Sequence, residues 1–308
     1  MNRRSFLVHL GAATALPLLS SRLHAEDKTA APNRSLHKVL SCNIRVALPE
    51  DEARGNGWST RRDVCIEVIR NQKPDVFCLQ EVLREQMHDL QRAFPNFGSF
   101  GFEGPEMDAR MVGYHGIAKN PIFYSQERYD LVTAGGYWLS ETPHIAGSLS
   151  WDSARARHVN WVRLRDRKSG RQFRVLSTHL DHVSQRAREE QTKMILADAA
   201  VYASEFPQIL AGDFNASAAN NVYNLVIEAG WTDSRMASPE PRDNGNTTHG
   251  FLGEKAPKSE AAKKRGPIDF IFIRGPVSTL EWKIVRDSRD GIYPSDHFFI
   301  AAQLAIDA

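Results

Sequence analysis

The stretch Ile209-Leu210-Ala211-Gly212-Asp213-Phe214-Asn215 is the most informative part of the chain for its fold. Its apolar half has the composition of a buried strand, and a proline precedes it. On an extended backbone, residues two apart point to the same side, so Asp213 and Asn215 can face one common group. Strands also end in Asp-x-Asn turns without any function, so this stretch alone leaves both interpretations open.

Similar runs recur, and each is an apolar strand with Asn, Asp, Glu or His where it starts or stops. They cover residues 39–43, 76–81, 175–181, 268–273 and 295–298. Further strands are predicted at 121–124, 137–140, 159–165 and 173–178, with a hairpin turn at Ser169 and Gly170. The recurrence gives these polar strand ends a weight that a single stretch lacks.

Helices are predicted between these strands, each from a polar side chain that can cap its first turn. They are expected from Ser59 or Thr60 to about Asn71, from Ser184 through Ala203, and from Asn220 or Asn221 to near Gly230. Strands with a few helices between them predict an α/β fold with mixed sheets rather than a regular βαβ repeat.

The N-terminal residues are typical of an export signal. Arg3 and Arg4 precede an uncharged apolar stretch that runs through Leu19, and small residues surround Ala25. This order predicts a twin-arginine signal at residues 1–25. A transmembrane anchor is the alternative, but the stretch is short for a bilayer and contains Pro17. We expect a flexible segment at 26–36, no stable membrane span, and a protein that is periplasmic or secreted.

Length and charge favour one domain with no general affinity for nucleic acid. The remaining residues, about 280, suit a single extensive core, predicted at 37–308. The chain has 39 Lys and Arg against 37 Asp and Glu, and loss of the three arginines of the signal leaves a net charge of −1. No positive field therefore draws the protein to nucleic acid. Basic clusters at 163–174 and 255–265 are equally compatible with binding and with solvated loops. A monomer is expected.

Cysteine spacing and short motifs exclude several chemistries. Cys42, Cys65 and Cys78 are odd in number and lack metal-like spacing, which favours buried free thiols over a disulfide. The sequence contains no glycine-rich phosphate loop, serine nucleophile elbow or zinc-type spacing.

The polar strand ends predict a phosphoester hydrolase. Asn43, Glu81, Asp213 and Asp296 offer hard oxygen ligands, which suit Mg²⁺ or Mn²⁺ better than zinc. Two imidazoles can neutralise charge on a phosphoryl oxygen, and a neighbouring carboxylate can fix one ring in a single tautomer. The two imidazoles are those of His179 and His297, and the carboxylate is that of Asp269. Taken singly, each has a structural interpretation: for example, Asn43 can cap a loop, and Glu81 can pair with Arg84 or Arg45.

With these motifs, the chain resembles the endonuclease/exonuclease/phosphatase superfamily, whose fold is DNase I-like. The motifs follow the family's order: Asn43, Gln80-Glu81, Thr178-His179-Leu180-Asp181, Gly212-Asp213-Phe214-Asn215, Ile268-Asp269-Phe270 and Ser295-Asp296-His297. The resemblance implies a four-layer α/β sandwich in which two packed mixed β-sheets are flanked by helices. It also implies roles for the motif residues: Asn43, Glu81 and Asp296 on the metal, Asp213 and Asn215 on the attacking water, and His179, His297 and Asp269 on the phosphoryl group.

A narrower resemblance is to mostly exported bacterial and fungal members whose substrates are poorly defined. It rests on Pro121-Ile122-Phe123-Tyr124, Trp138-Leu139-Ser140-Glu141-Thr142-Pro143, Ser150-Trp151-Asp152, His179-Leu180-Asp181-His182 and Thr247-Thr248-His249-Gly250-Phe251. The resemblance places His249 and Asp181 on the substrate side. Arg157 and Arg188 are candidates for a second phosphate contact, with a surface salt bridge as the alternative for either one alone. Ala118 departs from the pattern, because relatives often carry there a glutamate that can pair with the strand-end histidine, so the charge state of His179 is in question.

Three functions are compatible with the sequence. The first is a Mg²⁺- or Mn²⁺-dependent phosphodiesterase or phosphatase that acts, outside the cytoplasm, on a small phosphorylated molecule such as a sugar phosphate or a lipid headgroup. The second is an exported nuclease, which the lack of basic excess disfavours. The third is a catalytically silent binding module on the same fold.

Overall fold

Two six-stranded mixed sheets form the centre of the domain. The computed structural model describes residues 34–108, 117–239, 243, 245–257 and 266–307. The strand order of the first sheet is β11 (Val277–Val285), β12 (Phe299–Asp307), β1 (Arg34–Asn43), β2 (Val76–Gln80), β4 (Ile122–Ser125) and β3 (Phe97–Phe100). That of the second is β5 (Tyr129–Trp138), β6 (His158–Asp166), β7 (Gln172–His179), β8 (Gln208–Asp213), β10 (Asp269–Arg274) and β9 (Thr232–Asp233).

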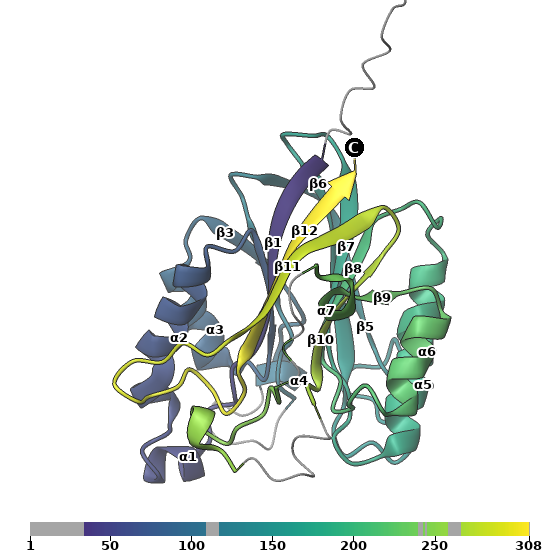
Figure 1. Cartoon of the computed structure of the whole chain (residues 1–308). Coiled ribbons are helices and arrows are strands. Elements are labelled where there is room, and N and C mark those ends of the chain that lie inside the picture. The colour runs from purple at the N-terminus through teal and green to yellow at the C-terminus, as the bar shows by residue number, and fades with distance from the viewer. Residues whose placement is uncertain (1–33, 109–116, 240–242, 244, 258–265, 308) are drawn as a thin grey trace, which may run out of the picture. The chain divides into compact units, whose positions relative to one another are not determined.

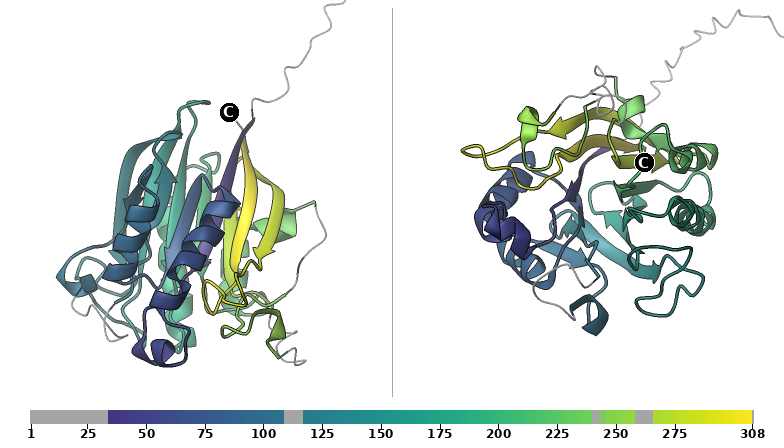
Figure 2. Two further views of the ribbon diagram at one scale, coloured as in Figure 1. Left: turned by 90° about the vertical axis from the view of Figure 1, so that its left-hand side faces the viewer. Right: turned by 90° about the horizontal axis from the view of Figure 1, so that it is seen from below.

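Helices cover the outer faces of both sheets (Figures 1 and 2). The first sheet packs on α2 (Trp58–Gln72) and α3 (Arg84–Ala93), and the second on α5 (Gln185–Ala200) and α6 (Asn221–Glu228). The short helical turns are α1 (Pro49–Ala53), α4 (Pro105–Asp108), α7 (Ser234–Ala237) and the 3₁₀ turn Gly253–Lys255. A third apolar layer, which includes Val39, Val175 and Ile209, lies between the sheets. The predicted four-layer α/β sandwich is confirmed.

Two of the three predicted helix caps are confirmed. The side chains of Ser184 and Asn220 accept hydrogen bonds from the first turns of α5 and α6. The predicted cap of α2 is wrong, because this helix already begins at Trp58. The backbone N–H and the hydroxyl of Ser59 instead donate to the carboxylate of Glu52. The helix α5 ends at Ala200, three residues before the predicted end.

The sequence patterns missed several strands and set some bounds too short. Strands β3, β9 and β11 were not predicted. The run predicted at 295–298 lies directly before β12, whose length was not predicted, and β5 extends from Tyr129 to Trp138 rather than covering 137–140. Strand β5 lies at a sheet edge and exposes Leu131 and Val132, so it lacks the alternation expected of a half-buried strand. Strand β1 begins at Arg34, where it pairs with Asp307, three residues before the predicted domain start at 37.

The three cysteines are buried free thiols, as predicted. Within the described ranges, no helix has both the length and the apolar character that a membrane crossing requires. The predicted export signal at 1–25 and most of the segment at 26–36 lie outside the described residues.

The strand register brings the polar motifs to one edge of the two sheets. Asp213 ends β8 and pairs with His179 on one side and with Asp269 on the other. Strands β7 and β8 run parallel and β10 runs antiparallel to them, so β10 starts where the other two end. In the first sheet, Asn43 at the end of β1 pairs with Gln80 at the end of β2.

Gly212 is expected to be essential for this register. Its φ is +157°, and a Cβ atom there would lie 2.1 Å from the carbonyl oxygen of Thr178 on β7. We predict that Gly212→Ala lowers the free energy of unfolding by about 2–4 kcal/mol, because β7 and β8 must separate. The matched control is Gly230→Ala, where φ is +81° but no atom lies within 4 Å. Gly230→Ala should lower the free energy of unfolding by only about 1–2 kcal/mol. Urea unfolding of both variants tests this, and an equal loss would contradict the steric explanation.

Candidate active site

A polar cleft of about 190 Å³ opens at the edge where the strand ends meet. Apart from two apolar residues, its walls are charged or polar. The lining residues are Arg45, Val46, Leu48, Glu81, Arg157, His179, His182, Asp213, Asn215, Asp296 and His297. Seven of the twelve site residues predicted from sequence line the cleft directly, and Asn43 and Asp269 bond to residues that do.

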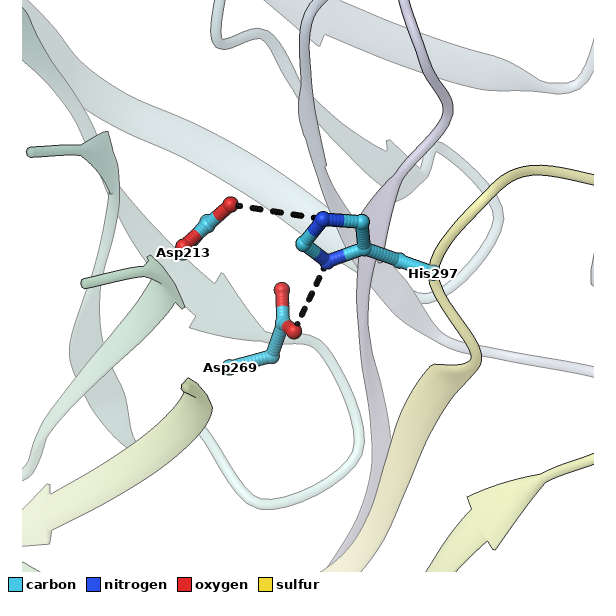
Figure 3. Close-up of side chains that lie close together, drawn as sticks. All are labelled: Asp213, Asp269 and His297. Carbon is cyan, nitrogen blue, oxygen red and sulfur yellow. Dashed lines mark hydrogen bonds and ion pairs between the residues drawn. The ribbon is translucent and has the colours of Figure 1, made fainter. Parts of the chain in front are cut away.

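His297 lies between two carboxylates (Figure 3). Its Nδ1 is 3.0 Å from Oδ2 of Asp269, and its Nε2 is 3.9 Å from Oδ2 of Asp213. Burial alone would lower the pKa of His297, but Asp269, Asp213 and Asp296 more than offset burial and raise this pKa well above 6.5. The ring is therefore an imidazolium at neutral pH, and Asp269 fixes its orientation, as predicted for a carboxylate beside such a ring.

Asp213 is buried and accepts several hydrogen bonds. Its Oδ2 accepts from Nδ2 of Asn43 at 3.0 Å, and its Oδ1 accepts from the backbone N–H of Asn215 at 2.9 Å. Burial, together with the charge of Asp269, raises the pKa of Asp213 to about 7. A carboxylate poised near neutral pH is suited to accept a proton from water.

His179 is held as a neutral ring. Nδ2 of Asn215 donates to the carbonyl oxygen of Leu180 at 3.0 Å and also lies 3.0 Å from Nε2 of His179. This Nε2 therefore accepts, which leaves the proton on Nδ1. Burial, and then the positive charge of Arg157, lowers the pKa of His179 well below 6.5. The Nδ1 atom is buried and lacks a hydrogen-bond partner among the described residues. The question raised by Ala118 is thus answered in favour of an uncharged imidazole.

Two carboxylates predicted to bind a metal, Glu81 and Asp296, also line the cleft. Oε1 of Glu81 accepts from Nδ2 of Asn43 at 3.1 Å, and Oε2 accepts from the backbone of Val46 at 3.0 Å. Asp296 lies 3.4 Å from Nη1 of Arg45. Two cleft carboxylates with hard oxygen donors fit Mg²⁺ or Mn²⁺. The amide oxygen of Asn43 instead accepts from the backbone N–H of Arg45, so Asn43 presents its NH₂ group to the carboxylates.

A second group of candidate ligand atoms belongs to Asp213, Asp269 and His297, whose atoms lie within 4.8 Å of one another. Here Nδ1 of the ring is bonded to the carboxylate of Asp269, so this nitrogen is a donor rather than a metal ligand. The chemistry of the donors favours the pair Glu81 and Asp296 as the metal site.

Of the four predicted substrate-binding residues, only Arg157 lines the cleft. The buried carboxylate of Asp181 accepts from the backbone N–H groups of Ala154, Val183 and Ser184, so it organises two loops.

The other two predicted residues, Arg188 and His249, also bond to nearby parts of the chain and do not line the cleft. Arg188 donates to the carbonyl oxygen of Asp181 and to Gln185. The ring of His249 packs 4.0 Å from that of Phe298, and its Nδ1 accepts from Gly253. The backbone N–H of His249 also donates to the carbonyl oxygen of Asp296. His249 thus supports the segment that carries Asp296.

Two residues of the cleft, Arg45 and His182, had no predicted role in the site. The guanidinium of Arg45 pairs with the buried carboxylate of Asp51 at 2.8 Å. Arg45, Glu81 and Asn215 all have positive φ angles, of 57°, 64° and 48°. Such conformations are unfavourable for side chains with a Cβ atom and cluster at functional sites.

The link between Asp269 and His297 gives a testable pH dependence. The raised pKa of His297 contributes stability that is fully present below the unfolded pKa, about 6.5, and is lost as the pH rises through the folded pKa. We predict that Asp269→Asn lowers the pKa of His297 and reduces this alkaline loss, because Nδ1 loses its nearest negative charge. NMR titration of the ring, with urea unfolding at about pH 6 and pH 9, measures both.

The control for this titration is Asp63→Asn, an exposed carboxylate that should change neither quantity. An unchanged pKa of His297 in Asp269→Asn would show that Asp269 does not hold the proton.

Comparisons with known proteins agree with the fold. A structure of an endonuclease/exonuclease/phosphatase family protein from Bacteroides thetaiotaomicron is 25% identical with a TM-score of 0.79, and the match covers 89% of this chain and 99% of that one. The mannosyl-6-phosphatase of B. thetaiotaomicron VPI-5482 is 26% identical with a TM-score of 0.76, over 87% and 99% of the two chains. Nocturnin of Drosophila melanogaster is 26% identical over 185 residues, which is 55% of this chain but only 26% of nocturnin.

The model of the Endonuclease/Exonuclease/phosphatase family matches residues 40–297, which include every predicted site residue. The chain belongs to this family.

Proposed function

We propose that the protein is a divalent-metal-dependent phosphoester hydrolase that acts on a small phosphorylated molecule. The observation that carries the proposal is one cleft that combines a buried carboxylate with a pKa of about 7, a protonated imidazole and a separate pair of carboxylates. These groups are, respectively, Asp213, His297, and Glu81 with Asp296.

Each group has a defined task in an in-line displacement. Asp213 accepts a proton from the attacking water, whose oxygen bonds to phosphorus while the ester oxygen leaves and is protonated by solvent. His297 places its positive charge on the phosphoryl oxygens, and Asp269 keeps the ring in position. Asn215 is fixed by its bond to the carbonyl of Leu180 and can orient the water. A Mg²⁺ or Mn²⁺ ion on Glu81 and Asp296 would supply charge neutralisation as a Lewis acid.

The comparisons and the charge of the chain support a small substrate. One structural neighbour is a mannosyl-6-phosphatase. A curated relative, the 3′-5′-exoribonuclease subunit Ccr4 of Emericella nidulans, keeps a nuclease as the second candidate, at 22% identity over 91% of this chain and 53% of that protein. The predicted net charge of −1 for the exported chain gives a nucleic-acid backbone little attraction.

The first test is hydrolysis of an aryl phosphomonoester and an aryl phosphodiester by the protein with Mg²⁺ or Mn²⁺. We expect turnover that a chelator abolishes. Glu81→Gln should weaken Mg²⁺ binding measured by calorimetry by about 100-fold or more, because one charged ligand is lost. The control is Glu67→Gln, which changes an exposed glutamate paired with Arg289. Chelator-resistant turnover, or equal Mg²⁺ affinity in both variants, would refute the assignment.

We also propose that the protein works outside the cytoplasm. The support is the order of Arg3, Arg4, an apolar stretch and Ala25 in the sequence. Lysine at both Arg3 and Arg4 should leave the chain unprocessed in the cytoplasm of a host with twin-arginine export, while the unchanged chain should be found outside the cytoplasm with a new N-terminus near Glu26. N-terminal sequencing of each fraction tests this. Export of the double variant at an unchanged level would exclude this route.

A further inference from the structure

Arg157 differs from the other deeply buried arginines of the described chain. Arg61 donates to five backbone carbonyl groups. Arg174 pairs with Asp198 at 2.6 Å and stacks on aromatic rings, and Arg235 pairs with Asp233 at 3.5 Å. Arg157 is only 5% exposed, yet within the described part of the chain no carboxylate lies within ion-pair distance of it. Its Nε is buried without a hydrogen-bond partner there, as is that of Arg174, so the missing close carboxylate is what distinguishes Arg157. The buried carboxylate of Asp181 acts on this guanidinium only from beyond ion-pair distance. A buried charge that lacks a close counter-ion is costly, which favours the binding of an anion here.

Among the residues that the structure describes, Arg157 has one hydrogen-bond partner, which is another residue of the cleft wall. Nη2 of Arg157 lies 3.3 Å from Nδ1 of His182. A guanidinium has no acceptor, so Nδ1 of His182 must accept and the ring proton resides on Nε2. The side chain of His182 is 44% exposed. Arg157 therefore fixes His182 as a hydrogen-bond donor at the wall of the cleft.

The second arginine of the cleft, Arg45, differs from Arg157 because it has carboxylates close to it. Arg45 is bonded to Asp51 and lies beside Asp296, so carboxylates already compensate its charge. Arg157 and His182 lie on the segments next to β6 and β7, and share the cleft with Asp213 and His297. An anion bound between them would lie next to the groups that act on phosphorus.

We propose that Arg157 and His182 form a subsite for a terminal phosphoryl group, which makes the protein select phosphomonoesters over phosphodiesters. This inference rests on the proposed phosphoester hydrolase activity. A monoester carries a charge of about −1.5 to −2 at neutral pH and has three non-bridging oxygens. A diester carries one charge and has two such oxygens. In a diester the third oxygen bears carbon, so the buried guanidinium would face an ester group that cannot compensate its charge.

The test compares p-nitrophenyl phosphate with bis(p-nitrophenyl) phosphate, using the full chain with Mg²⁺. We expect the unchanged protein to prefer the monoester. Arg157→Met should lower kcat/KM for the monoester on the order of 100-fold, the loss of a hydrogen bond to a charged group, with a much smaller change for the diester. The matched control is Arg165→Met, an exposed arginine of the same strand β6 paired with Asp130. Equal losses for both esters would overturn the proposal.

A second measurement separates the subsite from the activity. Calorimetric titration with inorganic phosphate in the presence of Mg²⁺ should show binding that Arg157→Met weakens by about tenfold or more, and unchanged phosphate affinity would overturn the subsite. If the unchanged protein hydrolyses neither ester, the proposed function fails, while phosphate binding still decides the role of Arg157. If Arg157→Met does not fold, Arg157→Lys and His182→Phe replace it. Full phosphate affinity in both would refute the subsite.

Discussion

The buried carboxylate of Asp213 is the group around which the strand ends are arranged. A carboxylate removed from water is tolerated only where hydrogen bonds or opposite charge replace its hydration. Asn43 and the backbone of Asn215 supply the hydrogen bonds, and the ring of His297 supplies the charge. These partners come from three separate parts of the chain. The compensation of one acid therefore constrains where β1, β8 and the segment before β12 can end or begin.

The same kind of turn follows a strand end in each of the two sheets. At the end of β1, the side chain of Asn43 accepts the backbone N–H of Arg45, and at the end of β8 Asp213 does so for Asn215. In each case the second residue has a positive φ. Asn and Asp favour such turns because their side chains bond to the backbone two residues on. The same side chains that serve the cleft thus stabilise the strained backbone beside it, which costs about 1–3 kcal/mol for each residue.

The sequence was sufficient to predict those site residues whose position follows from the end of a strand. Asp213, His179 and Asp269 lie together because strand register alone places them at one edge, and strand ends are visible as apolar runs that stop at polar residues. Arg45 and His182 lie in loops beyond such ends, where no periodicity indicates direction. Residue type could not show that Asp181, Arg188 and His249 lie outside the lining of the cleft. Whether a polar side chain bonds to nearby loop atoms depends on tertiary contacts. The edge strands β5 and β11 were missed or shortened for a related reason: exposure on an edge weakens the hydrophobic pattern.

The cleft is shared between two sheets that meet through a single apolar layer. Asn43 and Glu81 belong to the first sheet, Asp213 and Asp269 to the second, and His297 reaches the second from the segment that leads into β12 of the first. Neither sheet contains a working set of groups by itself. The active site therefore forms only after the two sheets have packed together. A shift of one sheet against the other would abolish activity before either sheet unfolded.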